Sequence, residues 1–376
     1  MIIHQVGFSS FRNLQDTSAA LSPRFTFVVG KNAQGKTNFL EAVSLVAELS
    51  SFRKAALKDL VTFNHQQALL SCEADSAGLD YQISLLLAKG SRRLKVNGKA
   101  VTRHKDHLGR LPLVTFTPDD VRLSQGGPQR RRQFLDRALF LFDPSHWDRC
   151  TDYNKHLKRR NILLKEQKSN DPLFEVYTEK LAQLGAQISQ ARLLMSKKVE
   201  KRMVAAVSTV SENHDQISLN YNTYLKDDIT DSIDNQQQEG NIQLLLEKLN
   251  RHLLRDRRVG YTTAGPHVED LEIKISERAA TSFASQGQHR TIALALKIAE
   301  IEVVHDVRGI FPTLLIDDLS SELDSERRER LFAYLRSTGG QVVLTATDQN
   351  IAQGFSGEEC IVYNVSNGQL TKIADY

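Results

Sequence analysis

The chain has 376 residues, of which 40% are hydrophobic and 25% charged, so it can bury one large core or two smaller ones. Its formal net charge of +4 is too small to indicate a nucleic-acid binder by itself. The three cysteines, Cys72, Cys150 and Cys360, are far apart, which argues against a disulfide framework or a zinc site. With no apolar run of about 18 residues and no signal-like N-terminus, we expect a cytoplasmic protein.

The first 118 residues read as mixed strand and helix. Residues 25–29 form a short apolar run that ends at Gly30, and residues 38–46 have helical spacing. Apolar and polar residues alternate over 80–87 and again over 93–96. The Asn-Gly pair that follows, at 97 and 98, predicts a hairpin turn.

The middle of the chain, from about 118 to 260, is mainly helical. Asp171 and Pro172 favour a helix start, and apolar residues then recur every three or four positions for roughly ten turns. Residues 147–168 are predicted to form an antiparallel partner helix, so that the pair makes an arm. A long helix in an ordinary bundle fits the same periodicity. The acidic, amide-rich stretch 226–240 predicts an exposed, mobile loop.

Strand patterns return after Gly260, at 271–275, 313–316 and 341–345, with a helix predicted over 288–304. The simplest architecture folds residues 1–118 and 265–376 together as one α/β lobe. Residues 119–264 are then an inserted, mostly helical arm lobe. The fold class predicted is therefore α/β, a P-loop ATPase head with a helical insertion.

One phosphate-binding motif stands out. The sequence from Gly30 to Thr37 fits G-x-x-x-x-G-K-[ST] and lies between a predicted strand and a predicted helix. Its backbone N–H groups and the helix N-terminus favour phosphate, Lys36 can reach the β- and γ-phosphates, and Thr37 can ligate Mg²⁺. A Gly-rich turn with a solvated lysine is the alternative. The motif predicts ATP and Mg²⁺ as cofactors, held by Gly30, Lys31, Asn32, Ala33, Gln34, Gly35, Lys36, Thr37 and Asn38.

Two further stretches carry polar groups where such a site needs them. The predicted strand 313–316 runs into Asp317 and Asp318; the first can hold Mg²⁺ and the second can polarise the attacking water, although paired acids also cap turns and helices. Ser285 and Gly287 open the preceding helix, where they form either an anion site or an ordinary cap.

The order of these parts resembles the ABC-type ATPases. That resemblance implies an ATP-dependent homodimer with composite sites, in which Ser285 of one chain caps the γ-phosphate held by the other. Thr347 stands where many members carry a histidine, and Asp318 where transporters usually have Glu, so we expect slow hydrolysis. The residues that the resemblance adds to the nucleotide site are Ser285, Gly287, Gln288, Ser321, Asp324 and Thr347, with Lys36, Ser285 and Asp318 in catalysis. No Q-loop glutamine is assigned.

The long helical insertion and several motifs resemble the RecF family of bacterial recombination mediators over about residues 1–370. These motifs include 10–14, 117–120, 127–136, 158–161, 262–271, 285–288 and 316–324. The resemblance implies a weak, DNA-stimulated ATPase in DNA replication, recombination, repair and the SOS response. It would dimerise with ATP on duplex, single-strand or gap-junction DNA and help RecO and RecR load RecA in place of single-strand binding protein. A transport or translation ATPase, or a scaffold without turnover, is the alternative.

Basic clusters are the candidate DNA contacts, since Lys and Arg bind phosphates without reading sequence. Any one such cluster is more often just a solvated face, and the one at 130–132 can instead serve the packing of one lobe against the other. The candidates are Arg92, Arg93, Arg130, Arg131, Arg132, Lys158, Arg159 and Arg160.

Overall fold

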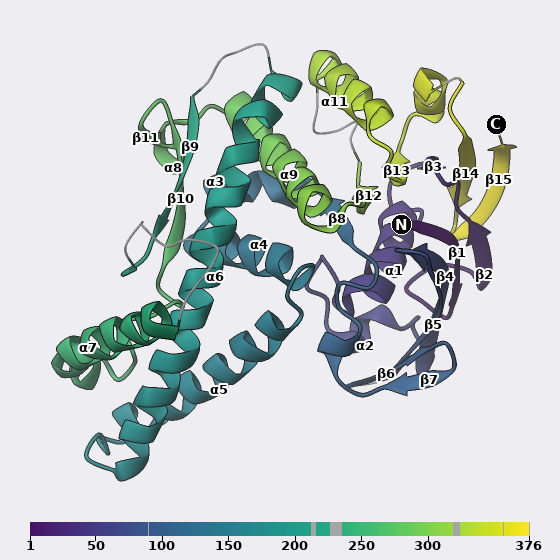
Figure 1. Ribbon diagram of the computed structural model, residues 1–376. Helices are drawn as coiled ribbons and strands as arrows, with labels where there is room; N and C mark the ends of the chain where they lie inside the picture. Colours follow the sequence, from purple (N-terminus) through teal and green to yellow (C-terminus); the bar gives the residue numbers. More distant parts are fainter. Residues whose placement is uncertain (89, 212–215, 226–234, 319–323, 356, 376) are drawn as a thin grey trace. The chain divides into compact units, whose positions relative to one another are not determined.

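The computed structural model describes residues 1–376 except 89, 212–215, 226–234, 319–323, 356 and 376 (Figure 1). It divides into two compact units, which we call the α/β unit (1–121, 205–214 and 286–376) and the helical unit (122–204 and 215–285). The predicted lobes differ mainly at the second boundary, because residues 265–285 group with the helical unit and not with the α/β unit.

The first sheet of the α/β unit carries the nucleotide motifs. Its central strands are parallel, and only the C-terminal strand runs antiparallel to its neighbour. The predicted strands near 25–29, 313–316 and 341–345 are therefore present. In spatial order the strands are β15 (Gln369–Asp375), β14 (Cys360–Ser366), β3 (Phe25–Val29), β13 (Val342–Ala346), β12 (Thr313–Ile316) and β8 (Leu113–Phe116).

A second, antiparallel sheet of the α/β unit alternates buried and exposed residues, as half-buried strands do. The turn at Asn97 and Gly98 is confirmed, with left-handed φ angles of 48° and 76°. In spatial order its strands are β2 (Thr17–Ala20), β1 (Ile2–Ser9), β4 (Gln67–Ser76), β5 (Leu79–Ala88), β6 (Ser91–Val96) and β7 (Lys99–Val101).

Helix α1 (Lys36–Glu48) lies in the core of this unit, where Phe39, Leu40 and Leu45 are fully buried among residues of both sheets. Helix α9 (Gln286–Arg308) contains the predicted helix 288–304 and buries most of its length. The remaining helices are α2 (Leu57–Leu60), η1 (His104–Asp106), η2 (Pro118–Val121), α11 (Ser325–Ser337) and η3 (Gln349–Phe355).

The helical unit contains the two long helices predicted for the middle of the chain. Helix α5 (Ser145–Lys165) and the 39-residue α6 (Pro172–Val210) are joined by a short connection, and α5 lies against the first part of α6 (Figure 1). The last residues of α6, from Ala205, belong to the α/β unit. The other elements are α3 (Arg122–Gln125), α4 (Pro128–Phe140), α7 (Asn235–Val259), α8 (Ala280–Phe283) and a sheet of β9 (Ile217–Asn222), β10 (Asp270–Ile275) and β11 (Arg278–Ala279).

The predicted loop over 226–240 is partly wrong. Residues 235–240 form the first turns of α7, and residues 226–234 lie outside the described residues. Leu245 and Leu249 of α7 pack on Tyr153, Leu181 and other apolar residues of α5 and α6, so that the helix is stabilised from its buried face. Among the described residues, none of the helices combines the length and apolar character that crossing a membrane requires.

Candidate nucleotide-binding site

The phosphate-binding motif has the geometry that its sequence predicts. It joins the end of β3 to the first turn of α1, and Gly35 stands at the helix N-cap with φ 122°, a conformation that favours glycine. The backbone amides of the first helical turn have no partner within the helix and are directed out of its N-terminus. This loop can therefore hold a phosphate chain against the positive end of the helix dipole.

Lys36 lies within this loop. Its ammonium donates hydrogen bonds to the carbonyl oxygens of Gly30, at 2.8 Å, and Lys31, at 3.0 Å. Burial lowers the pKa of Lys36, while the charges of Asp318 and Asp317 oppose that shift. A cation that is largely removed from water and held at the mouth of a phosphate loop is placed to pair with an anionic ligand.

The two acids follow β12 at the same edge of the sheet. The Oδ1 atom of Asp317 accepts hydrogen bonds from the hydroxyls of Thr37 and Thr345, each at 2.9 Å. Burial raises the pKa of Asp317, and this outweighs the two hydrogen bonds, which lower it. A carboxylate and a hydroxyl in contact are the oxygen donors that Mg²⁺ prefers, so Thr37 and Asp317 fit the predicted metal role.

A hairpin turn that sequence reasoning missed braces the phosphate loop. Between β14 and β15, the N–H of Gly368 donates to the carbonyl of Gln34, at 3.0 Å, and the N–H of Asn367 donates to the side-chain oxygen of Gln34, at 2.6 Å. A Cβ atom on Gly368 would lie 1.9 Å from the carbonyl oxygen of Asn13. The Asn-Gly pair predicts the turn, but not its position over the loop.

A second missed feature is a pair of arginines on the buried carboxylate of Glu41, in α1. Arg12 binds both carboxylate oxygens, at 2.9 Å each, and Arg53 lies 3.8 Å away. The guanidinium of Arg53 also donates to the side chain of Asn38, at 3.0 Å, and its charge lowers the pKa of Asp317 as a minor contribution. Arg53 is therefore a basic residue beside the first turn of α1 and near the acid that is predicted to bind the metal.

The residues expected to act across a dimer occupy element ends. Ser285 directly precedes α9, and Gly287 and Gln288 lie in its first turn. Asp324 caps α11 by accepting a hydrogen bond from a backbone N–H, at 2.9 Å, and Thr347 is exposed just after β13. Ser321 lies outside the described residues. The composite arrangement of these residues remains a prediction.

The predicted DNA contacts separate into accessible and buried residues. Arg93, Lys158 and Arg159 are exposed, and Arg130 is half-buried. Arg92 is also half-buried and donates to the carbonyl of Leu49. The exposed residues remain candidates for phosphate contacts.

For Arg131 and Arg160, the prediction of DNA contact is wrong. Arg160 is fully buried and donates to Asp256, at 2.9 Å, and to Thr262, at 2.6 Å. Arg131 is buried as well and binds both carboxylate oxygens of Asp270, at 2.8 Å each. Their charges are neutralised inside the helical unit, so neither guanidinium can reach a phosphate.

Arg132 is better placed for packing than for DNA. It is half-buried, donates to the carbonyl of Glu269 at 2.6 Å, and burial lowers the pKa of its guanidinium. Arg131 and Arg132 therefore take part in packing, whereas the expected packing of one lobe against the other stays a prediction. These contacts lie within the helical unit.

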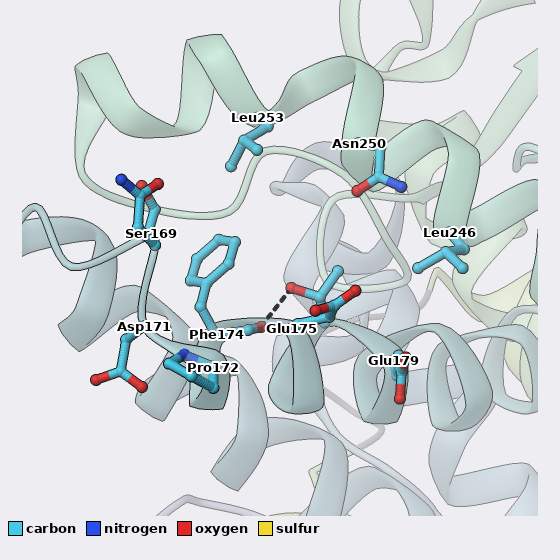
Figure 2. Close-up of a pocket in the computed structure, with 11 residues that line it drawn as sticks. Ser169, Asp171, Pro172, Phe174, Glu175, Glu179, Leu246, Asn250 and Leu253 are labelled. Atoms are coloured by element: carbon cyan, nitrogen blue, oxygen red, sulfur yellow. Dashed lines mark hydrogen bonds between the residues drawn. The ribbon is translucent and has the colours of Figure 1, made fainter.

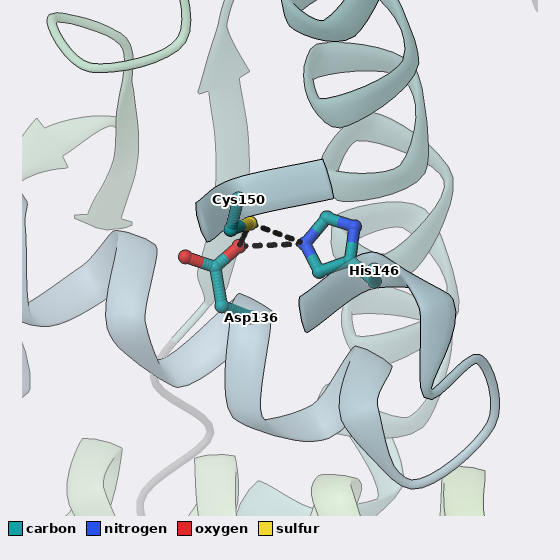
Figure 3. A group of neighbouring side chains, drawn as sticks. All are labelled: Asp136, His146 and Cys150. Atoms are coloured by element: carbon teal, nitrogen blue, oxygen red, sulfur yellow. Dashed lines mark hydrogen bonds and ion pairs between the residues drawn. The ribbon is translucent and has the colours of Figure 1, made fainter. Parts of the chain in front are cut away.

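Within the described residues, one group of unlike side chains comes within metal-ligating reach of one another: Asp136, His146 and Cys150 (Figure 3). His146 Nε2 lies 2.9 Å from Asp136 and 3.4 Å from the Cys150 sulfur. However, Arg192 binds both oxygens of Asp136, at 2.8 Å each, and burial raises the pKa of Cys150 to about 12. We assign this group to the packing of α4, α5 and α6.

The helical unit also has a groove of about 540 Å³ between the start of α6 and α7 (Figure 2). Phe174, Leu246 and Leu253 supply apolar lining, and the charged residues of the lining are Asp171, Glu175 and Glu179. Because every charged group that lines it is acidic, this groove is unsuited to phosphate.

Comparison with known proteins identifies the family. The family described as RecF/RecN/SMC N terminal domain matches residues 2–371. The DNA replication and repair protein RecF of Myxococcus xanthus is 36% identical over 97% of this chain and 96% of its own length. That of Geotalea uraniireducens is 34% identical over 98% of this chain and its full length.

Comparison with solved structures leads to the same family. A structure of the recombination mediator protein RecF-ATP in the RecFOR pathway has a TM-score of 0.88 and 29% identity, and the match covers 99% of this chain and 97% of the other. An SMC head bound to the C-winged helix domain of ScpA shares the fold, with a TM-score of 0.57 and 14% identity. The ABC-type head with helical regions, expected from the motif order, is thereby confirmed. The chain belongs to the RecF family of DNA replication and repair proteins.

Proposed function

We propose that this chain is an ATP-gated DNA-binding mediator of recombination. It binds Mg-ATP, dimerises on gapped or junction DNA, and resets by slow hydrolysis that DNA stimulates. The observation that carries the proposal is the contact of Thr37 with Asp317, at 2.9 Å, because it joins the phosphate loop to the acidic strand end across 280 positions of sequence. That pairing is the core of a P-loop ATPase site.

The chain's own residues divide the work of the site. The backbone amides of the loop and Lys36 bind the phosphates, and Thr37 and Asp317 hold Mg²⁺, which supplies positive charge at the β- and γ-phosphates when bound. Asp318, the next residue, would orient a water and accept its proton. Slow turnover is consistent with an aspartate as base and with Thr347 in the position where related ATPases often have histidine.

ATP would also act as the link between two copies. The N-terminal turn of α9, with Ser285, Gly287 and Gln288, is a helix N-terminus that favours negative charge. In the proposed dimer this turn faces the γ-phosphate bound by the other copy, with Asp324 at the seam. Loss of the γ-phosphate would then separate the two copies.

DNA would be held by its backbone. The exposed residues Arg93, Lys158 and Arg159 can pair with phosphates on any sequence, which suits a protein that recognises gaps and junctions. The RecFOR pathway named for the solved relative supports RecO and RecR as partners, and through them RecA and single-strand binding protein. These partners remain part of the proposal.

The test is the affinity for a short gapped duplex, measured by fluorescence anisotropy with ATP, with ADP and without nucleotide. We expect tight binding only with ATP, and a steep loss as salt rises because counterions are released. Lys36→Ala is the matched control: it should bind DNA weakly whether or not ATP is present. Equal DNA affinity of the wild-type chain with ATP and with ADP would contradict the proposal.

A further inference from the structure

We propose that Thr345 is a positioning residue which, through one hydroxyl group, fixes both acids of the site: the Mg²⁺ ligand Asp317 and the water-orienting Asp318. The inference rests on the proposed ATPase function and adds a residue outside the usual motifs. Thr345 lies in β13, 28 positions from Asp317, and is fully buried.

Strand register places Thr345 beside the acids. Ile316 of β12 pairs with Leu344 of β13, so the next residues along the two parallel strands, Asp317 and Thr345, are neighbours. Thr345 itself pairs with Val28 of β3, two residues before the phosphate loop. Its hydroxyl therefore stands at the sheet edge where the loop and the acids meet.

The hydroxyl makes two hydrogen bonds in opposite senses. It donates its single hydrogen to the Oδ1 atom of Asp317, at 2.9 Å, and accepts from the backbone N–H of Asp318, at 2.9 Å. A hydroxyl has one donor and two acceptor sites, so both bonds can form together. The direction of each bond is fixed, because a carboxylate with no proton only accepts and an amide only donates.

The backbone explains why Asp318 needs this partner. The N–H of Asp317 still bonds within the sheet, to the carbonyl of Phe116 at 2.9 Å. Asp318 is the first residue beyond the sheet ladder and has a left-handed φ of 46°, which is unfavourable for a residue other than glycine. Thr345 supplies the hydrogen bond that holds its amide in this turn and so sets the direction of its side chain.

The same hydroxyl orients the carboxylate of Asp317. Thr37 also donates to Oδ1, at 2.9 Å, but its oxygen is the expected Mg²⁺ ligand, and that role changes its bonding. Thr345 is buried behind the acids and can keep its bond to Asp317 when Mg²⁺ is present. Partners of this kind orient metal ligands, and their loss usually costs about 10- to 100-fold in metal affinity or activity.

The experiment compares Thr345→Val, which keeps the shape but removes the hydroxyl, with Thr345→Ser, which keeps the hydroxyl. The measurement is the Mg²⁺ concentration that half-saturates binding of a fluorescent ATP analogue, supported by the Mn²⁺ EPR spectrum of the ATP complex. We expect Thr345→Val to need about 10- to 100-fold more Mg²⁺ and to broaden or lose the bound Mn²⁺ signal. Thr345→Ser should remain close to wild type.

Thermal unfolding of both variants separates positioning from packing. If Thr345→Val lowers only the melting temperature and leaves the Mg²⁺ requirement unchanged, the inference is overturned; the same holds if Thr345→Ser is as impaired as Thr345→Val. If Thr345→Val does not fold, the serine variant and a Thr345→Ala variant still give the comparison. A chain that does not bind DNA but whose Mg²⁺ requirement depends on this hydroxyl would reject the DNA-binding part of the proposed function and support the inference.

Discussion

Replacing Gly368 by alanine tests whether the C-terminal hairpin positions the phosphate loop. The chain offers a matched control, because Asn97-Gly98 and Asn367-Gly368 are both Asn-Gly turns with nearly equal φ angles: 48° and 76° in the first, 49° and 75° in the second. A Cβ atom at Gly98 meets nothing within 4 Å, whereas at Gly368 it would lie 1.9 Å from the Asn13 carbonyl oxygen. Gly98→Ala and Gly368→Ala therefore impose the same backbone strain, but only Gly368→Ala brings the new Cβ atom against another part of the chain.

The expected magnitudes follow from that difference. A left-handed conformation costs an L-residue about 1–2 kcal/mol, so Gly98→Ala should lower the free energy of unfolding by that amount. At Gly368 the turn must also shift, which weakens two hydrogen bonds to Gln34 and adds about 2–3 kcal/mol. Gly368→Ala should therefore cost about 3–5 kcal/mol. Because Gln34 belongs to the phosphate loop, ATP affinity should also fall, by about tenfold or more.

The assay is urea unfolding of both variants, followed by titration of the folded proteins with a fluorescent ATP analogue. Gly98→Ala should bind the analogue as the wild-type chain does. Equal destabilisation by the two substitutions would refute the argument from contact. Normal ATP affinity in Gly368→Ala would refute the claim that the hairpin positions the loop.

Three further predictions concern single side chains. Lys36→Ala should remove measurable ATP binding in the same titration, and undiminished binding would reject the phosphate-loop assignment. Arg160→Met should lower the free energy of unfolding by about 3–5 kcal/mol, because it leaves the buried carboxylate of Asp256 without its cationic partner. Lys158→Met should leave stability unchanged in urea but weaken DNA binding, and the reverse pattern would contradict both assignments. Burial lowers the pKa of His267 below its ordinary 6.5, so the imidazole takes up a proton more readily in the unfolded chain than in the folded one. The free energy of unfolding should therefore fall as the pH drops below about 6.5. A His267→Gln variant should lose less stability than the wild-type chain between pH 7.5 and 5.5, and an identical loss would contradict this assignment.

The sequence predicts local features of this molecule well. The phosphate loop, the strand before the paired acids and the long helix α6 each have a pattern that depends only on neighbouring residues. The hydrogen bonds of Thr345 with the two acids, and of Gln34 with the C-terminal hairpin, join segments far apart in sequence. Strand register creates these contacts, and no local pattern encodes register between distant strands.

The burial of Arg160 and Arg131 could have been predicted from helical spacing. Arg160 shares steps of three and four with Tyr153, Leu157 and Leu164, which places it on the inward stripe of α5. Arg131 bears the same relation to the buried residues 134, 135 and 138 of α4. Helical spacing thus separates these arginines from their exposed neighbours, while counting charges in a cluster does not.

The start of α7 shows a limit of composition. Residues 235–240 are polar and include a glycine, which is typical of a loop, yet they are helical in the structure. The apolar residues that stabilise this helix lie further along it, at 245 and 249. Tertiary packing of one part of a helix can therefore extend it into a segment with weak helical preference.

The most direct test of the ATP-gated mechanism is a measurement of molar mass in solution by light scattering. The wild-type chain and Ser285→Ala are each measured with short duplex DNA at modest salt, with and without Mg-ATP. The mechanism predicts a monomer that becomes a DNA-bound dimer only with ATP, and a Ser285→Ala chain that still binds ATP but remains largely monomeric. A wild-type mass that ATP does not change would contradict the mechanism, as would a Ser285→Ala chain that dimerises fully.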